Sequence, residues 1–121
     1  MSKELYFDIH GEDSGGSLYR VTEPNGEIAF LYNHSVSDPA TGEVEVFDTW
    51  YISFEGFWKR LTEDPEWYYR HPLFVHPDQR DFVRQRLKDV NWGIYPDKKW
   101  QESHQRQWKK VLTDPTTYYR R

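Results

Sequence analysis

Apolar and polar positions follow different periods in the two halves of the chain. Up to residue 52, short β-prone apolar runs alternate with turn-forming residues, and Asn25-Gly26 between two of them is a strong hairpin signal. The intervening residues 11–17 and 35–42 are predicted loops. Because strands that are consecutive in sequence usually pair, three or four of these runs predict an antiparallel meander. The predicted strands are residues 4–10, 18–23, 27–34 and 43–52.

The last predicted strand begins with alternating acidic and apolar side chains. Successive side chains of a strand point to opposite faces of the sheet. The alternation predicts that Val44, Val46 and Trp50 face the core. It also predicts that Glu43 and Glu45 face water.

From residue 53 onward, apolar residues recur at helical spacing and form one stripe. The first predicted helix begins after Ser53, a suitable N-cap. It ends at Asp64-Pro65, because proline disfavours helical geometry in the residue before it. Its apolar stripe consists of Phe54, Phe57, Trp58 and Leu61.

The rest of the chain predicts a connector and two further helices. Residues 65–77 are aromatic and are broken by Pro72 and Pro77, so we interpret them as a connector. Pro77 suits the start of the second helix, and Gly93 suits its end. The third predicted helix covers residues 97–112. Its apolar stripe consists of Trp100, His104 and Trp108.

A thirteen-residue phrase occurs twice, fifty residues apart, as Trp58–Arg70 and Trp108–Arg120. The copies share Trp, Lys, Asp, Pro, two adjacent Tyr and the final Arg. In each copy, Trp stands near a predicted helix end, basic residues follow, and Asp-Pro ends the helix. Basic side chains there suit the negative end of the helix dipole. A shared way of ending a helix explains most of the repetition, and a paired aromatic-basic clamp is the alternative.

The composition predicts one domain over residues 1–121. The chain is 36% hydrophobic and 18% aromatic, with six Trp and nine Tyr. Large aromatic side chains bury about 150–250 Å² each, so we expect a core built mainly from rings. Residues 1–52 are mainly strands and residues 53–121 mainly helices. The predicted class is α+β, with an N-terminal antiparallel meander sheet of three to four strands packed by two to three C-terminal helices.

Cysteine is absent, which excludes disulfides and thiolate metal sites and is typical of a reducing compartment. The first residues lack the basic flank and apolar run of a signal peptide. No run approaches the roughly 18 apolar residues of a membrane-spanning helix. We therefore expect a soluble, cytoplasmic protein.

The net charge of −4 conceals an asymmetry between the two halves. Residues 1–57 hold two basic and eleven acidic residues, a net charge of −9, whereas residues 58–121 carry +5. Attraction between oppositely charged halves of one fold is the simpler explanation. The functional interpretation is an acidic face that recruits a basic partner.

Motifs for catalysis or cofactor binding are weak in this sequence. There is no Cys nucleophile and no G-x-S-x-G, and residues 11–17 lack the Lys-Ser/Thr ending of a phosphate loop. His71 and His76 are close in sequence, but each precedes a proline, and a zinc site needs four converging ligands. We therefore expect no catalytic residue, no metal and no cofactor.

Basic residues on the two later helices raise the alternative of single-stranded nucleic-acid binding, because basic grooves with aromatic platforms bind single strands. Acidic residues interrupt these runs, however. The pI of about 5.7 is also opposite to the usual footprint of such proteins. The residues concerned are Arg80, Arg84, Arg86, Lys88, Lys98, Lys99, Arg106, Lys109 and Lys110.

A non-enzymatic protein-binding module fits these observations best. A small, acidic, aromatic-rich domain suits a stoichiometric inhibitor, because acidic surface speeds association with a basic target and Trp or Tyr rings anchor it. The concrete hypothesis is a bacterial immunity protein or antitoxin-like inhibitor of a basic, nuclease-type toxin. A small ligand-binding or enzymatic domain with an aromatic pocket is a further alternative. The predicted partner-binding residues are Glu12, Asp13, Glu23, Glu27, Asp38, Glu43, Glu45, Asp48, Trp50 and Tyr51.

Overall fold

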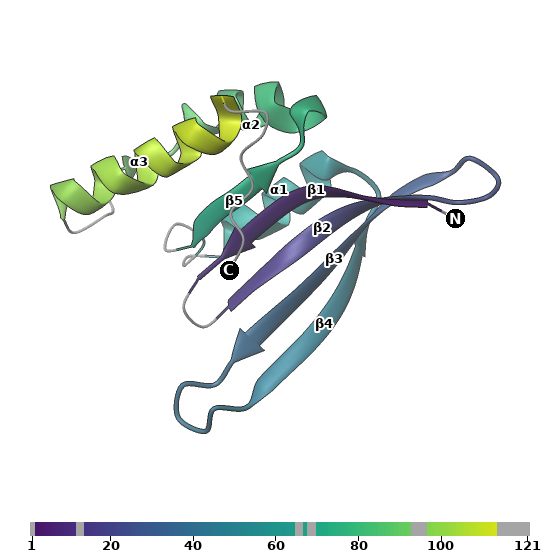
Figure 1. Ribbon diagram of the computed structural model, residues 1–121, viewed down its shortest axis with the longest axis horizontal. Coiled ribbons are helices and arrows are strands. Elements are labelled where there is room, and N and C mark those ends of the chain that lie inside the picture. The colour runs from purple at the N-terminus through teal and green to yellow at the C-terminus, as the bar shows by residue number, and fades with distance from the viewer. Residues whose placement is uncertain (1, 12–13, 65–66, 68–69, 93–96, 114–121) are drawn as a thin grey trace.

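The computed structural model describes residues 2–11, 14–64, 67, 70–92 and 97–113 of the chain (Figure 1). The strands are β1 (Ser2–His10), β2 (Ser14–Thr22), β3 (Ile28–Ser37), β4 (Val44–Tyr51) and β5 (His71–Val75). The helices are α1 (Phe54–Glu63), the 3-10 helix η2 (Pro77–Gln79), α2 (Arg80–Leu87) and α3 (Lys98–Thr113). The predicted α+β class is confirmed, with a fifth strand beyond the three or four expected.

The five strands form one antiparallel sheet in the order β4-β3-β2-β1-β5. The first four strands make the predicted meander, and Gly26 takes a positive φ of 88° in the β2–β3 turn, where glycine has no Cβ penalty. β2 begins at Ser14, so part of the predicted loop 11–17 is strand. Gly16 lies close to β3 there, because an added Cβ would come within 2.6 Å of the His34 Cβ.

β5 contradicts the interpretation of residues 65–77 as a connector without a strand. His71–Val75 pairs with β1 and forms the second edge of the sheet. Pro72 is compatible with this position, because an edge strand has one side on which no ladder hydrogen bond is made.

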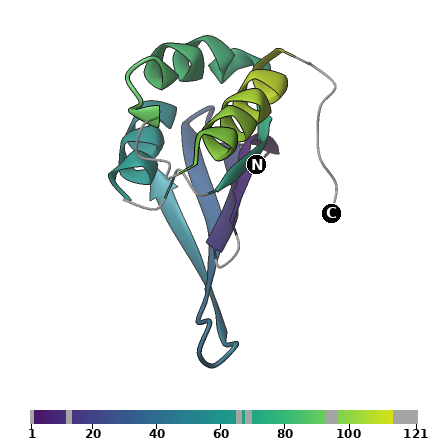
Figure 2. The ribbon, with the colours of Figure 1, turned by 90° about the vertical axis from the view of Figure 1, so that its left-hand side faces the viewer.

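The helices lie to one side of the sheet, and the β3–β4 hairpin extends away from them (Figure 2). Phe7 on β1 is central to the core between these layers. Its ring lies 5.5 Å from that of Phe57, 6.1 Å from that of Trp58 and 6.2 Å from that of Trp108. Trp58 and Trp108, which begin the two copies of the repeated phrase, pack edge to face at 5.9 Å. The core is therefore built on aromatic rings.

α1 begins and ends as predicted. Ser53 Oγ accepts a hydrogen bond from the Gly56 N–H at 3.1 Å, and Asp64 is the C-cap in an extended conformation. Arg70 Nη2 donates to Asp64 Oδ2 at 2.6 Å, which ties the segment after α1 back to the helix end. Both Tyr pairs of the repeated phrase, and its second copy beyond Thr113, lie outside the described residues.

The two later helices differ from prediction in length. Pro77 opens the 3-10 helix η2, which runs into α2, and α2 already ends at Leu87. Gly93, the predicted end of this helix, lies outside the described residues. α3 matches the predicted residues 97–112 within one residue at each end.

The side chains of β4 face the opposite way from the prediction. Tyr51 packs on Phe57 of α1 with ring centroids 5.6 Å apart, so every second residue counted back from Tyr51 faces the helices. Val44, Val46 and Trp50 lie on the other face and are 60%, 65% and 54% exposed. The prediction was wrong because alternation distinguishes two faces without showing which one the helices cover.

Candidate functional site

The exposed large hydrophobic side chains of the described residues gather on β3, β4 and the residue after β4. Single exposed apolar residues are normal on a protein surface, whereas larger exposed apolar patches mark binding sites. β4 and Ile52 supply five of the seven. The seven are Ile28, Val36, Val44, Val46, Phe47, Trp50 and Ile52.

The same part of the chain is acidic. Residues 21–58 contain seven acidic residues and no Lys or Arg. Glu43 and Glu45 are exposed, as predicted, and Asp48 accepts a hydrogen bond from Asn33 Nδ2 at 2.8 Å. These residues give an apolar surface a negative local field. We define the β4 surface as Glu43, Val44, Glu45, Val46, Phe47, Asp48, Trp50 and Ile52.

The backbone of β4 is open along one side. The Asp38 N–H donates to the Glu43 carbonyl at 2.8 Å, which makes the next pair, Ser37 and Val44, a pair without mutual hydrogen bonds. Bonded and non-bonded pairs alternate in an antiparallel ladder, so the N–H and C=O groups of every second residue up to Trp50 point away from β3. No side chain of the described residues bonds these groups. The residues are Val44, Val46, Asp48 and Trp50.

Six of the ten predicted partner-binding residues lie on β4 or in the turn before it. They are Asp38, Glu43, Glu45, Asp48, Trp50 and Tyr51. Glu23 and Glu27 lie in the β2–β3 turn, which adjoins the end of β4 because Phe30 near the start of β3 pairs with Tyr51. Glu12 and Asp13 lie outside the described residues.

Tyr51, the other aromatic residue among the predicted partner-binding residues, packs at the edge of the core. Its ring is half-buried against α1, and burial raises the pKa of its hydroxyl. Conversely, sequence reasoning missed Val44, Val46, Phe47 and Ile52 as surface residues. No signal within β4 could have found them, because alternation distinguishes two faces without showing which one is covered.

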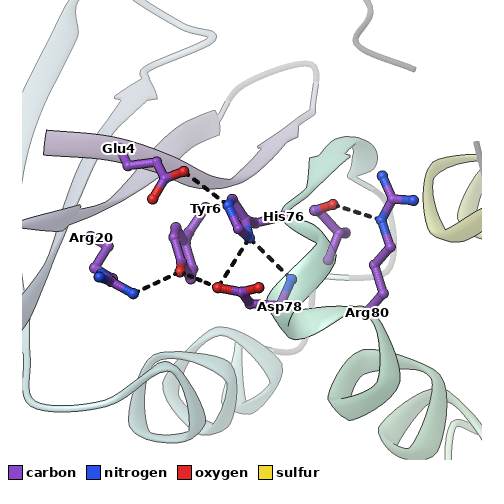
Figure 3. A network of polar contacts seen from close by, with 7 residues as sticks. Glu4, Tyr6, Arg20, His76, Asp78 and Arg80 are labelled. Atoms are coloured by element: carbon purple, nitrogen blue, oxygen red, sulfur yellow. Dashed lines mark hydrogen bonds and ion pairs between the residues drawn. The ribbon is translucent and has the colours of Figure 1, made fainter. Parts of the chain in front are cut away.

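A polar network joins β1, β2 and η2 (Figure 3). Tyr6 Oη accepts from Arg20 Nη1 at 3.0 Å and donates to Asp78 Oδ2 at 2.7 Å. The Asp78 N–H donates to His76 Nδ1 at 3.0 Å. This places the proton of the neutral ring on Nε2, 3.0 Å from Glu4 Oε2. Burial, together with the bond to Asp78, raises the pKa of the Tyr6 hydroxyl.

This network has the residue types of acid–base chemistry, but the tyrosine at its centre is buried. Tyr6 is only 1% exposed, and the His76 ring stacks on it at a centroid distance of 4.0 Å. A general acid or base must reach the proton that it transfers. The buried hydroxyl instead bonds two side chains of the protein, and the network fastens η2 to the sheet.

His71 begins β5 and His76 follows it as the N-cap of η2, and the two rings contact different neighbours. The His71 ring stacks on that of His104 at 4.5 Å, whereas His76 stacks on Tyr6. Burial and the neighbouring His104 lower the pKa of His71. In the part of the chain that the structure describes, no group of three or more His, Asp or Glu side chains could hold a metal ion.

A cleft of about 480 Å³ lies between α1 and strands β2 to β4. Tyr32 and His34 are among the residues that line it. Burial raises the pKa of Tyr32 to about 12. Burial and the positive charge of Arg70 lower the pKa of His34. Arg70 is already bonded to Ser14 Oγ at 2.7 Å and to Asp64 Oδ2 at 2.6 Å. This cleft is one of those that a small-ligand function would use.

The basic residues of α2 are largely engaged within the protein. Arg80 is buried, and its Nε donates to the Val75 carbonyl at 3.1 Å. Arg84 donates to Asp81 Oδ1 at 2.7 Å and to the Leu112 carbonyl at 2.6 Å. The exposed basic face therefore lies mainly on α3. Its residues are Lys98, Lys99, Arg106, Lys109 and Lys110.

Comparison of the chain with models of protein families, with curated proteins and with solved structures gave no match. Among the described residues, no helix is both long enough and apolar enough to cross a membrane. Because no related protein indicates a site, the assignment of the β4 surface as the candidate site depends on its geometry and charge alone.

Proposed function

We propose that this protein is a non-enzymatic protein-binding module that holds its partner on the β4 surface. The observation that carries the proposal is that five of the seven exposed large hydrophobic side chains of the described residues lie on β4 or directly after it, at an acidic edge of the sheet. Covering apolar surface is favourable by about 25 cal/mol per Å². Trp50 is the expected anchor, because Trp is enriched among the residues that dominate binding energy.

The charge of this surface favours a basic partner, because complementary charge raises the association rate and excludes wrong partners. The concrete form of the proposal is a bacterial immunity protein or antitoxin-like inhibitor that neutralises a basic, nuclease-type toxin. We place it in the cytoplasm, which the absence of cysteine supports. The burial of Tyr6, whose hydroxyl already bonds Arg20 and Asp78, supports a non-enzymatic role.

Affinity capture of the tagged protein from a lysate of its native host tests the proposal. The lysate is nuclease-treated and capture is repeated at low and high salt. We expect one stoichiometric protein partner, which Glu45→Lys and Trp50→Ala lose. Glu102→Lys, on the exposed face of α3, changes the net charge equally and should keep the partner. Capture that is the same with all three variants would contradict the proposal.

Single-stranded nucleic-acid binding is a second candidate function, and the exposed face of α3 favours it. Five basic side chains lie there beside one acidic side chain, Glu102. Phosphate contacts would make such binding strongly salt-dependent. Lys109→Glu combined with Lys110→Glu should then abolish binding of a labelled oligonucleotide at low salt. Absence of binding by the unaltered protein at low salt would end this alternative.

A further inference from the structure

We propose that the partner contributes an extended, basic segment that adds to the sheet as a sixth strand beside β4. This inference rests on the proposed function and specifies how the partner binds. Strand addition is a recurring recognition mode in which main-chain hydrogen bonds give affinity and alternate side chains give specificity.

The main chain of β4 is suited to this mode. Its outward N–H and C=O groups recur at every second residue from Val44 to Trp50, a span of about 20 Å at roughly 3.3 Å per residue. β3 and β4 pair without any register shift, so no bulge turns this edge away from an incoming strand. A segment of about seven residues can therefore pair along the whole edge.

The face of the sheet away from the helices offers apolar neighbours to an added strand. Four side chains stand directly opposite one another across β1 to β4, in a row that ends at the edge. They are Leu5, Tyr19, Leu31 and Trp50. The first three are half-buried, whereas Trp50 is exposed on its outer side. An apolar residue on the added strand would continue the row and cover Trp50.

The charges of β4 favour a basic segment over a second copy of this chain. Pairing of two β4 strands would bring two sets of Glu43, Glu45 and Asp48 onto one short seam, and like charges on facing strands are destabilising. Lys or Arg at alternate positions of the partner would instead neutralise Glu43 and Glu45, which share one face of the sheet, and would leave apolar positions for the face of Trp50. β4 itself contains neither Lys nor Pro, the residues that commonly block edge pairing.

A fluorescein-labelled nonapeptide of alternating lysine and valine serves as the probe. Fluorescence anisotropy with the full-length chain at low ionic strength should show saturable binding. Two control peptides of the same length carry glutamate in place of lysine, or a methyl group on every backbone nitrogen. Both controls should bind at least about tenfold more weakly, because one loses the charge and the other the main-chain donors. Equal binding by the methylated peptide would overturn strand addition, and so would absence of binding by the lysine–valine peptide.

Two substitutions of Val46 separate main-chain from side-chain contributions. Val46→Ala keeps the outward N–H, whereas Val46→Pro also removes it, on the side of an edge strand where proline is tolerated. Val46→Pro should weaken probe binding by about tenfold or more, and Val46→Ala by less than about threefold. Hydrogen exchange gives the same test on the unaltered chain, since the probe should slow exchange of the outward amides at least about tenfold. Unchanged exchange under saturating probe would overturn the inference.

The capture experiment distinguishes this inference from the proposed function. If the host partner is lost by Glu45→Lys and Trp50→Ala but kept by folded Val46→Pro, protein binding stands and strand addition is refuted. If none of these variants loses the partner, both fail. Analytical ultracentrifugation of the chain alone tests whether a second copy of the chain pairs with this edge. A dimer that Val46→Pro abolishes would assign the edge to that second copy and would refute the proposal of a basic partner segment.

Discussion

The two edges of the sheet, β5 and β4, are built in opposite ways. β5 is five residues long, contains Pro72 and packs against α3 (Figure 1). Gln107 Nε2 donates to the Pro72 carbonyl at 3.0 Å, and Arg80 Nε donates to the Val75 carbonyl at 3.1 Å. Side chains from two helices therefore satisfy backbone groups of this edge.

β4 has none of these protections in the described part of the chain. It is eight residues long, contains no proline and no basic residue, and exposes apolar side chains. Open edges invite pairing with other chains, and natural proteins usually block them. This chain blocks one edge with a helix and leaves the other open, and the open edge is the one to which the proposal assigns binding.

The largest effect is expected from Trp108→Ala, which loosens the cover of the β5 edge. Trp108 is 2% exposed and packs on Phe7 and Trp58, and truncation of a core Trp costs about 3–5 kcal/mol. Urea unfolding followed by circular dichroism measures the loss. Trp50→Ala removes the same ring from β4 and should cost about 0.5 kcal/mol or less. Similar losses in the two variants would contradict the difference between the edges.

Arg80→Met should have a smaller effect at the same edge. It removes the donor to the Val75 carbonyl, and a buried acceptor left without a donor costs about 1–3 kcal/mol. The free energy of unfolding in urea is the measurement. Arg106→Met, on the exposed face of α3, is the control and should leave stability unchanged. If the stability of Arg80→Met is unchanged, water satisfies the Val75 carbonyl as well as the guanidinium does, and this contact does not stabilise the edge.

Local signals in the sequence were sufficient for part of this fold. The Asn25-Gly26 turn and the Ser53 cap were predicted because their geometry depends on residues nearby in the chain. β5 was not predicted, because Pro72 breaks the pattern of a strand. Proline is tolerated at an edge, but tertiary packing decides which strand becomes an edge.

The candidate site was also predicted only in part. Glu43, Glu45 and Trp50 were singled out for their charge and aromatic character, but the alternation also assigned Trp50, with Val44 and Val46, to the core face. Alternation along a strand establishes that two faces differ. Which face receives the helices depends on strand order and on where α1 packs, and neither follows from the strand's own residues.

Reversal of Glu43 and Glu45 to Lys should act on the β4 edge alone. Both carboxylates are exposed, so we expect unchanged unfolding but association with a basic partner slowed by about tenfold at low ionic strength. The salt dependence of the association rate should also become flatter. Surface plasmon resonance over a salt series measures both. Glu63→Lys with Glu102→Lys changes the net charge equally on the helices and is the control; an unchanged rate for the β4 variant would remove this surface from the proposal.

The smallest effect is expected from pH at the β5 edge. Burial and the neighbouring His104 lower the pKa of His71 below its ordinary value of 6.5. The folded state therefore binds this proton less readily than the unfolded state does. The stability that results is present above about pH 6.5 and is lost as pH falls through that value toward the folded pKa.

His34 beside β4 shifts in the same direction through burial and the charge of Arg70, so the two edges can be compared by titration. Urea unfolding between about pH 7.5 and pH 5 should show stability falling with acid, with a shallower slope in His71→Gln and in His34→Gln. Because His71 stacks on α3, its variant should also reduce the acid-induced exchange of β5 amides, whereas His34→Gln should not. An unchanged slope in His71→Gln would mean that α3 covers this edge independently of the histidine pair, and a shallower slope in His34→Gln alone would then assign the pH dependence to the β4 side of the sheet.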